Sequence, residues 1–315
     1  IVPGDVFWGM AGAPYFNSAA VEGRTDATRA EVIAALSDDI ENWFTPVTRS
    51  GGRAMERAVF LSYFHRLKWL AYEGGPDTFG GNNVAAKREA SLDPAMREMC
   101  TRYLRRWYEA GGGLFNWFVM GAGNWESPYG SWTLLESISG TSPKLTAMDD
   151  TLNSPKPEPT WGVPVPGTID ARRVAGANAD WQTANPYARY LGRGSRLDYL
   201  VRSPRAGGFR LRFHAAQTGS RPGTFEVWVN GRYVTRVNAP RTPGGEEFRP
   251  SDWTAIKLDR GLNGIRIVVP QERPYHLRSI ELTDVTPVGA TELTATNAGS
   301  RRISLTWKRA PEGAI

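Results

Sequence analysis

The stretch Thr224-Phe-Glu-Val-Trp-Val-Asn-Gly-Arg-Tyr-Val234 decides the fold of the second half of this 315-residue chain. Apolar and polar residues largely alternate on both sides of Asn230-Gly231, which is the period of a strand with one buried face. An Asn-Gly pair between two such runs is typical of a two-residue type I′ hairpin. The stretch therefore predicts two antiparallel strands joined by a tight turn.

The same period continues on either side of this hairpin. Largely alternating segments occur at 197–202, 208–215, 253–258 and 263–269. Short strands at regular spacing, with turn residues between them, indicate an antiparallel sandwich. We therefore expect an antiparallel β-sandwich of jelly-roll type at 167–285.

The first 152 residues show helical periodicity between short apolar runs. Apolar runs at 5–16, 67–75 and 114–120 predict three buried strands. Helices are expected between and after them, at 27–43 with Asp26 as its cap, at 53–66, from Asp93-Pro94 to the glycines 111–113, and at 143–152. Alternating strands and helices imply parallel strands with right-handed crossovers.

Two further segments complete the expected organisation, which is multidomain α/β plus all-β. Pro155, Pro157 and Pro159 fall at every second position of 153–166, a pattern typical of a semi-rigid polyproline-like linker. The last segment, 286–315, has the pattern of two strands only, and two strands alone are marginally stable.

Composition and charge exclude several classes of function. The net charge is +6, but the arginine pairs at 105–106, 172–173 and 301–302 lie in different segments, so no basic stripe predicts nucleic-acid binding. The single cysteine, Cys100, allows no intrachain disulfide, and no Cys/His cluster suggests zinc. No apolar run is long enough to span a bilayer.

Aromatic residues are abundant, with 12 Trp and 11 Tyr. Large cores account for such a number, and so do sugar-binding surfaces, because an aromatic ring offers a flat apolar face to a sugar. Composition alone leaves both readings open.

The sandwich resembles carbohydrate-binding modules of the family 6 and 35 type over residues 168–285. Besides Asn230-Gly231, the resemblance rests on Ile169-Asp-Ala-Arg172, Gly194-Ser-Arg-Leu-Asp-Tyr199, Pro204-Arg-Ala-Gly-Gly-Phe209, Trp253 and Leu258-Asp-Arg-Gly-Leu-Asn-Gly-Ile-Arg266. It implies a polysaccharide partner.

The resemblance also implies which residues of the sandwich touch sugar. Tyr187 or Tyr190 in one loop and Trp253 in another take the positions of the aromatics that clamp the ligand. His276 stands where the modules have a sugar-binding Asn. Packing at the edge of the core is the alternative role for these aromatics.

A structural calcium site in the sandwich is a further implication. The modules bind this calcium through the second acid of their opening motif, and here Arg172 stands at that position. Asp170, together with backbone carbonyls, is the metal-binding candidate that remains. No other cofactor is expected.

Residues 1–152 resemble strands six to eight of the (β/α)₈ barrel of clan A glycoside hydrolases. The resemblance rests on Ala13-Pro-Tyr-Phe16, Ala71-Tyr-Glu-Gly-Gly75, Asp93-Pro-Ala-Met-Arg97 and Tyr129-Gly-Ser-Trp132. It implies a partial barrel whose missing strands belong to another chain or to an unassigned segment, because half a barrel leaves two sheet edges open.

In that clan the nucleophile is a Glu at the end of strand seven, which is Glu73 here. Barrel active sites lie at this end of the strands, and a retaining mechanism needs a second carboxyl about 5–5.5 Å away. In the clan that acid/base comes from an Asn-Glu pair on strand four, and no Asn-Glu pair occurs in this chain. A purely structural role for Glu73, such as pairing with an Arg, therefore stays open.

Three aromatics accompany Glu73 in this prediction. Tyr15 is expected to hydrogen-bond the nucleophile, and Trp132 to floor the subsite of the cleaved sugar, with packing as its alternative role. Trp8 is a further substrate-binding candidate, whereas Glu126 is expected to be solvated.

The tail at 286–315 resembles the first two strands of a fibronectin type III domain, with Trp307 as its core residue. The favoured function is a secreted, retaining, polysaccharide-active glycoside hydrolase with an appended binding module, at an extracellular or cell-surface location. The alternatives are a non-catalytic glycan-binding or cell-surface protein with a degenerate barrel, and a structural protein that assembles into a surface layer or filament.

Overall fold

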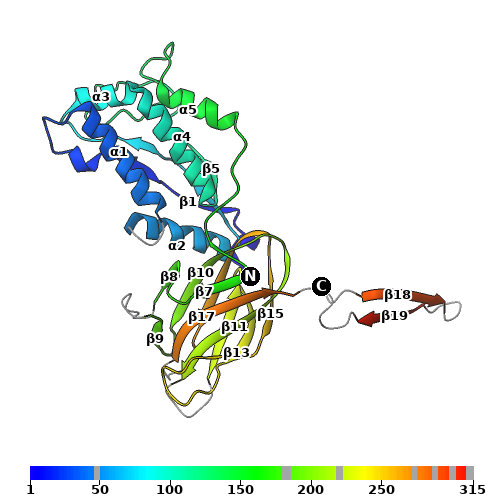
Figure 1. Ribbon diagram of the computed structural model, residues 1–315. Coiled ribbons are helices and arrows are strands. Elements are labelled where there is room, and N and C mark those ends of the chain that lie inside the picture. Colours follow the sequence, from blue (N-terminus) through cyan, green and yellow to red (C-terminus); the bar gives the residue numbers. More distant parts are fainter. Residues whose placement is uncertain are drawn as a thin grey trace.

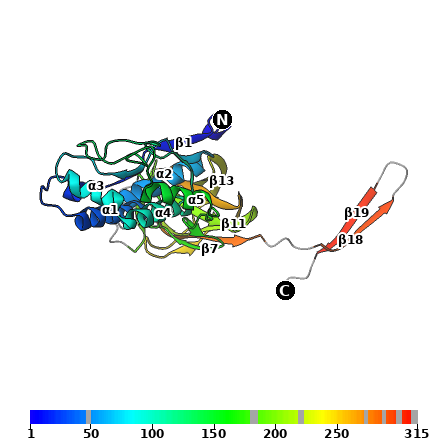
Figure 2. The same cartoon turned by 90° about the horizontal axis from the view of Figure 1, so that it is seen from above.

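The computed structural model describes residues 1–45, 50–178, 186–217, 223–271, 275–285, 290–297 and 303–309. Within these ranges, side chains are described for residues 1–45 and 54–285. An α/β part and a β-sandwich pack end to end, and a C-terminal hairpin lies apart from both (Figures 1 and 2). Among the described residues, no helix has the length and apolar character needed to cross a bilayer.

The α/β part is built on parallel strands. β1 (Gly9–Gly12), β3 (Lys68–Ala71) and β5 (Gly112–Phe115) form a sheet in the order β1-β3-β5. β2 (Tyr15–Asn17) and β4 (Gly75–Asp77) pair in parallel just beyond the ends of β1 and β3. Three parallel strands were expected here.

The first strand is shorter than the expected run at 5–16. Pro3–Asp5 form a short 3₁₀ helix, and the Asp5 carboxylate accepts a hydrogen bond from the backbone N–H of Val2 (3.1 Å). Phe7 and Trp8 are exposed and lie before β1. The expectation of a single buried strand at 5–16 was therefore wrong, because β1 covers only Gly9–Gly12 and Ala13-Pro14 separates it from β2.

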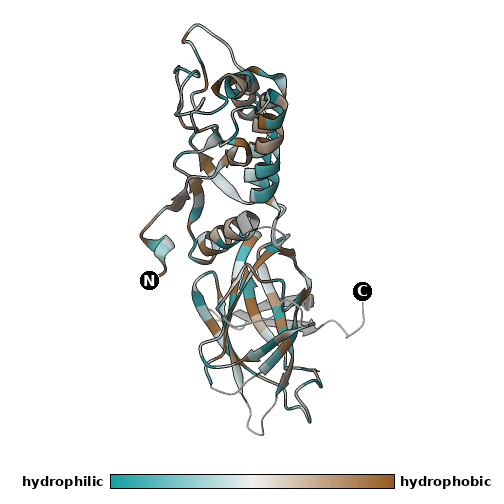
Figure 3. Ribbon diagram, turned by 90° about the vertical axis from the view of Figure 1, so that its left-hand side faces the viewer, coloured by the Kyte–Doolittle hydropathy of each residue, from teal (hydrophilic) through white to brown (hydrophobic). Residues whose placement is uncertain are grey.

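The helices of this part lie on one side of the sheet (Figure 3). They are α1 (Arg29–Phe44), α2 (Ser50–Phe64), α3 (Val84–Leu92), α4 (Pro94–Glu109) and α5 (Pro143–Leu152). α1 begins after Thr28 and not after Asp26, because Thr28 and Glu31 form a capping box. Asp93 caps α4 as expected, whereas α3 was not expected.

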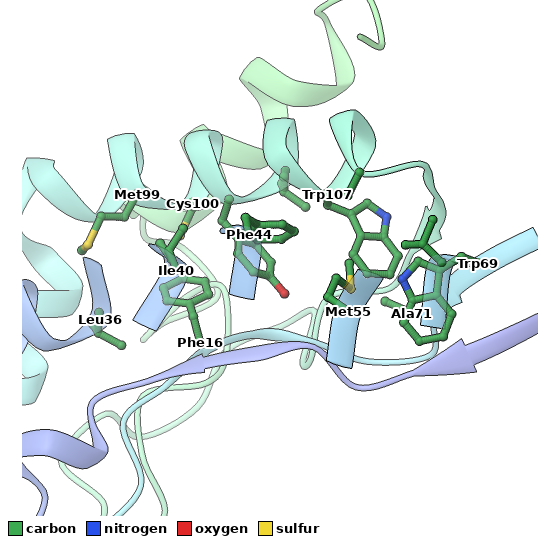
Figure 4. Close-up of a cluster of buried hydrophobic side chains, with 14 of the residues drawn as sticks. Phe16, Leu36, Ile40, Phe44, Met55, Trp69, Ala71, Met99, Cys100 and Trp107 are labelled. Atoms are coloured by element: carbon green, nitrogen blue, oxygen red, sulfur yellow. The ribbon is translucent and has the colours of Figure 1, made fainter. Parts of the chain in front are cut away.

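The core of this part lies between the helices and the sheet. Figure 4 shows the aliphatic and aromatic side chains of α1 and α4 meeting those of the strands, among them Phe16, Ile40, Phe44, Cys100 and Trp107. The other face is partly open: Leu114 and Tyr72 are 56% and 57% exposed. Among the described strands, β1 and β5 each pair only with β3, so both edges of the sheet are open.

The sandwich has two antiparallel sheets, as expected. One contains β6 (Val163–Pro164), β8 (Gly176–Ala177), β10 (Arg196–Ser203), β12 (Thr224–Val229), β13 (Arg232–Asn238) and β16 (Gly261–Val268). The other contains β7 (Gly167–Asp170), β9 (Ala188–Leu191), β11 (Gly207–Gln217), β14 (Arg249–Pro250), β15 (Thr254–Leu258) and β17 (Tyr275–Asp284). Only β6 and β10 pair in parallel.

The hairpin between β12 and β13 is confirmed. Asn230 and Gly231 both have positive φ, at 48° and 77°, as a type I′ turn requires. The Asn230 carboxamide oxygen also accepts a hydrogen bond from the N–H of Gly264 on β16 (2.9 Å). The turn is thereby tied to the neighbouring strand.

The junction between the two parts is closely packed. Phe64 at the end of α2 lies under the guanidinium of Arg266 on β16, with Cζ 4.1 Å from the ring centroid. Leu200 and Leu262 of the sandwich belong to the same buried cluster as Phe64. The Arg173 guanidinium forms an ion pair with the buried Glu56 (2.8 Å).

The segment 153–166 does not separate the parts as a free spacer would. The backbone N–H of Thr160 donates to the carbonyl of Glu109 (2.7 Å), and Trp161 packs against the hydrophobic core of the α/β part. Val163–Pro164 then forms β6 of the sandwich. In the C-terminal segment, β18 (Ala290–Asn297) and β19 (Ile303–Arg309) form the two expected strands, and the side chain of Trp307 lies outside the described residues.

Candidate functional site

Glu73 and Tyr15 meet at the carboxyl ends of the parallel strands. Glu73 lies between the end of β3 and the start of β4, and Tyr15 opens β2 directly opposite Gly75. The Tyr15 hydroxyl lies within interaction range of the Glu73 carboxylate. Burial, followed by the negative charge of Glu73, holds the pKa of Tyr15 well above its usual range, so the phenol stays protonated and acts as the donor.

The two glycines after Glu73 are required by their aromatic neighbours. A Cβ on Gly74 would come within 2.6 Å of the Phe115 ring, and Gly75 has a φ of 135° with the Trp117 ring 3.0 Å from the place of its Cβ. The chain therefore turns at Gly74-Gly75 in contact with β5 and the residues that follow it. This turn fixes the position of Glu73 at the strand end.

Trp132 joins this site through Asp77, an acid that the sequence does not predict as a site residue. Its indole Nε1–H donates to Oδ1 of Asp77 (2.9 Å), and its ring centroid lies 5.4 Å from that of Phe118. Phe118 in turn lies edge-on to Tyr15, with centroids 6.3 Å apart. An acid two residues after the Gly pair, on the same strand, was the available signal for Asp77.

Trp8 does not belong to this group. It precedes β1, beside Lys68 at the start of β3, so it lies at the opposite end of the parallel sheet from Glu73. Its ring is 61% exposed. The Glu126 side chain is 70% exposed, in agreement with a solvated role.

In the sandwich, Tyr187, Tyr190 and His276 come together. The His276 ring centroid lies 5.3 Å from that of Tyr187 and 5.1 Å from that of Tyr190. Tyr187 is buried and its hydroxyl donates to the Glu246 carboxylate (2.6 Å), whereas Tyr190 is 62% exposed. Tyr187 thus supports the cluster and Tyr190 presents a ring to solvent.

His276 is buried, and within the described part of the chain neither of its ring nitrogens has a hydrogen-bond partner. Burial, and then the positive charge of Arg189, lowers the pKa of His276, so the imidazole stays neutral. A neutral imidazole offers one donor and one acceptor. Both ring nitrogens are themselves buried, beside the rings of Tyr187 and Tyr190.

Trp253 does not face this cluster, contrary to the expected clamp. It precedes Thr254, which lies opposite Leu211 on β11, whereas His276 lies opposite Ala216. Five residues along a strand span about 16 Å. The Trp253 ring instead lies under the guanidinium of Arg212, 4.2 Å from Cζ.

The surroundings of Asp170 do not fit a calcium ion. Its Oδ1 accepts from the backbone N–H and Nε of Arg172 (2.8 and 3.0 Å), and its Oδ2 from Nη2 of the same residue (2.7 Å). The hydrogen bond from Arg172 is the main cause that lowers the pKa of Asp170. Over the described ranges, no three Asp, Glu, His or Cys side chains are grouped as metal ligands.

The chain matches no family model and no curated protein. Similar solved structures include the family 35 carbohydrate-binding module from Cellvibrio japonicus Abf62 (14% identity, TM-score 0.32, 38% of this chain and 94% of that one). A second is the carbohydrate-binding module CBM6cm-2 from Cellvibrio mixtus lichenase 5A in complex with cellotriose (18%, 0.33, 38% and 98%). A third is the exo-β-1,3-galactanase from Phanerochaete chrysosporium (22%, 0.33, 37% and 29%).

Proposed function

We propose that this chain is part of a secreted, retaining, polysaccharide-active glycoside hydrolase whose β-sandwich binds carbohydrate. The placement of Tyr15 beside Glu73 at the carboxyl ends of parallel strands is the observation that carries the proposal. In (β/α)₈ barrels the catalytic residues lie at this end of the strands. β1, β3 and β5 are, on this proposal, strands six to eight of such a barrel.

In the proposed reaction, Glu73 is the nucleophile that attacks the anomeric carbon of the sugar. Tyr15 is the donor that orients the carboxylate for attack. Phe118 and Trp132 supply apolar ring surfaces beside it. The acid/base carboxyl is expected on the strands that would complete the barrel, on another chain or an unassigned segment.

The sandwich is proposed to hold the same polysaccharide at an extracellular or cell-surface location. Tyr190 presents an exposed ring on which a sugar face can stack, and the buried His276 packs against that ring from below. Tyr187, held by Glu246, packs beside His276. This cluster is therefore the proposed glycan site of the sandwich.

The alternative is a non-catalytic glycan-binding or assembly protein with a degenerate barrel. Two observations favour it: the chain contains no Asn-Glu pair, and both edges of the described parallel sheet are open. Open edges are templates for pairing with another chain. On this reading, Glu73 and Tyr15 are a structural remnant.

Replacing Glu73 by Gln tests the proposal in the complete barrel, that is, in this chain together with the strands that would supply the acid/base carboxyl. Wild-type protein and Glu73→Gln are assayed on a panel of polysaccharides by release of reducing ends, with Glu126→Gln as the exposed-carboxylate control. We expect hydrolysis of at least one polysaccharide, loss of that activity in Glu73→Gln, and full activity in Glu126→Gln. Full activity in Glu73→Gln removes Glu73 from the mechanism, and glycan binding without hydrolysis by the wild type supports the alternative.

A further inference from the structure

A hollow of about 270 Å³ lies next to the candidate site, between the end of β2 and the loop after β4. We call it the rim hollow; its walls are formed by Asn17, Ser18, Glu22, Asp77, Phe79 and Trp132. Asn17 and Asp77 are opposite each other in the β2–β4 register, two residues beyond Tyr15 and Gly75. Two strand residues span about 7 Å, so the rim hollow lies about that far along the strands from Tyr15.

The strand side of the rim hollow is rigidly held. The Asn17 carboxamide donates to the Asp39 carboxylate (2.9 Å) and accepts from the N–H of Ala19 (3.0 Å). The N–H of Ser18 donates to the carbonyl of Asp77 (3.0 Å). These contacts lock β2, β4 and the turn after β2 into one wall.

The loop side is held by two buried lysines. The ammonium of Lys87 on α3 donates to the carbonyls of Phe79 and Gly80 (2.8 and 2.9 Å), and Lys144 on α5 donates to the carbonyl of Ser131. Both side chains are almost wholly buried, at 2% and 0% exposed. Burying an ammonium costs several kcal/mol before its contacts compensate. The fold thus fixes the loops that carry Phe79 and Trp132 at an energetic cost.

The polar groups that remain in the rim hollow are hydrogen-bond acceptors. Oδ1 of Asp77 accepts from Trp132 Nε1 and from the N–H of Phe79 (both 2.9 Å), and neither bond uses Oδ2. Glu22 has no hydrogen bond or ion pair through its carboxylate to any described residue. Two carboxylates beside two aromatic rings suit a ligand that offers hydroxyl donors and an apolar face, which is the surface of a sugar.

From this arrangement we propose that the rim hollow is a subsite for one further neutral sugar unit of the chain that is cleaved at Glu73. Glu22 and Asp77 accept hydrogen bonds from its hydroxyls, and Phe79 and Trp132 contact its apolar face. Because both acids are anionic, the subsite disfavours a uronic acid at this position. The proposal rests on the function proposed for Glu73 and adds chain-length and charge preference to it.

The test uses the full chain carrying Glu73→Gln, with the indole N–H of Trp132 as a local NMR reporter of the rim hollow. Neutral cello-, xylo-, manno- and galacto-oligosaccharides of increasing length are titrated, along with uronic acid-containing oligosaccharides. We expect a shift of the Trp132 signal, and about tenfold tighter binding, when the oligosaccharide is long enough for one of its sugar units to reach the rim hollow. Glu22→Ala and Asp77→Asn should each lose most of that gain, and Glu98→Ala, an exposed acid on α4, should retain it.

The outcomes separate this proposal from the one it rests on. The wild type could hydrolyse a polysaccharide through Glu73 while Glu22→Ala and Asp77→Asn keep the same gain in affinity for the longer oligosaccharide. That result would overturn the subsite and leave the proposed hydrolase activity in place. An equal gain for a uronic acid unit also overturns the subsite. If no oligosaccharide shifts the Trp132 signal and nothing is hydrolysed, both proposals fail.

Discussion

The Tyr15 hydroxyl lies beside the Glu73 carboxylate, although the two residues are 58 positions apart in the sequence. Parallel pairing of β2 with β4 places Tyr15 opposite Gly75, and the Gly74-Gly75 turn presents Glu73 to it. The contact joins the only two residues that the sequence predicts as catalytic. Its consequences are measurable in both activity and titration.

Tyr15→Phe removes the donor while keeping the ring. A hydrogen bond to a charged group contributes about 1.5–3 kcal/mol, so we expect kcat/KM to fall by roughly 10- to 100-fold. In a spectrophotometric titration, the difference between wild type and Tyr15→Phe should show no tyrosinate from Tyr15 at pH 10, because its pKa is raised. Ionisation of Tyr15 at pH 10 would contradict the contact with Glu73.

Lys144 should make stability depend on pH above neutrality. Burial lowers the pKa of Lys144 from 10.5 to about 7 in the folded protein. Between pH 7 and 10 the unfolded chain therefore binds a proton that the folded one lacks, and the free energy of unfolding rises with pH. The groups facing its ammonium are the Trp125 ring, the Ser131 carbonyl, Cys100 and Glu136.

Urea unfolding of wild type and Lys144→Met at pH 7 and pH 9 measures this contribution. The gain in stability between the two pH values should be larger in the wild type than in Lys144→Met. Cys100 acts in the opposite direction, because burial raises its pKa to about 12 and the folded protein then keeps a thiol proton that the unfolded chain begins to lose near pH 9. Both proteins contain Cys100, so the comparison between them removes its contribution. An identical pH dependence in both proteins would show that Lys144 keeps its proton across this range.

The sandwich should bind glycan through Tyr190 and not through Trp253. Tyr190→Ala removes an exposed ring above His276, and loss of one stacking ring is expected to weaken binding about tenfold on a glycan array. Trp253→Ala is the matched aromatic control, since its ring contacts Arg212 in a different part of the sheet. The reverse pattern would move the glycan site to the surface around Trp253.

Gly231→Ala should destabilise the protein more than Gly194→Ala. Both glycines have similar positive φ values, 77° and 80°, so both substitutions introduce left-handed strain of about 1–2 kcal/mol. A Cβ on Gly231 would also lie 2.8 Å from the carbonyl oxygen of Phe64 and 2.9 Å from Val2, whereas nothing lies within 4 Å at Gly194. Urea unfolding gives the difference between the two variants, which measures how tightly the hairpin packs on the α/β part. Equal losses of stability would mean that Phe64 and Val2 move away from the added Cβ at little energetic cost.

Local features of this protein were determined by the sequence itself. The Asn230-Gly231 turn, the Asp93 cap of α4 and the full extent of α5 depend on the conformational preferences of neighbouring residues, and each occurs where the sequence predicts it. Glu73 at a strand end follows in the same way from an apolar run that stops at two glycines. Such features need no knowledge of distant contacts.

The tertiary structure alone decided which distant residues meet. The register of β11 separates Trp253 from His276, parallel packing sends Trp8 to the opposite end from Glu73, and Arg172 occupies the carboxylate of Asp170. The bond between Trp132 and Asp77 and the packing of Phe64 on Arg266 join residues more than 50 positions apart. Strand register and side-chain packing set these contacts, and neither is encoded in the local pattern of the residues involved.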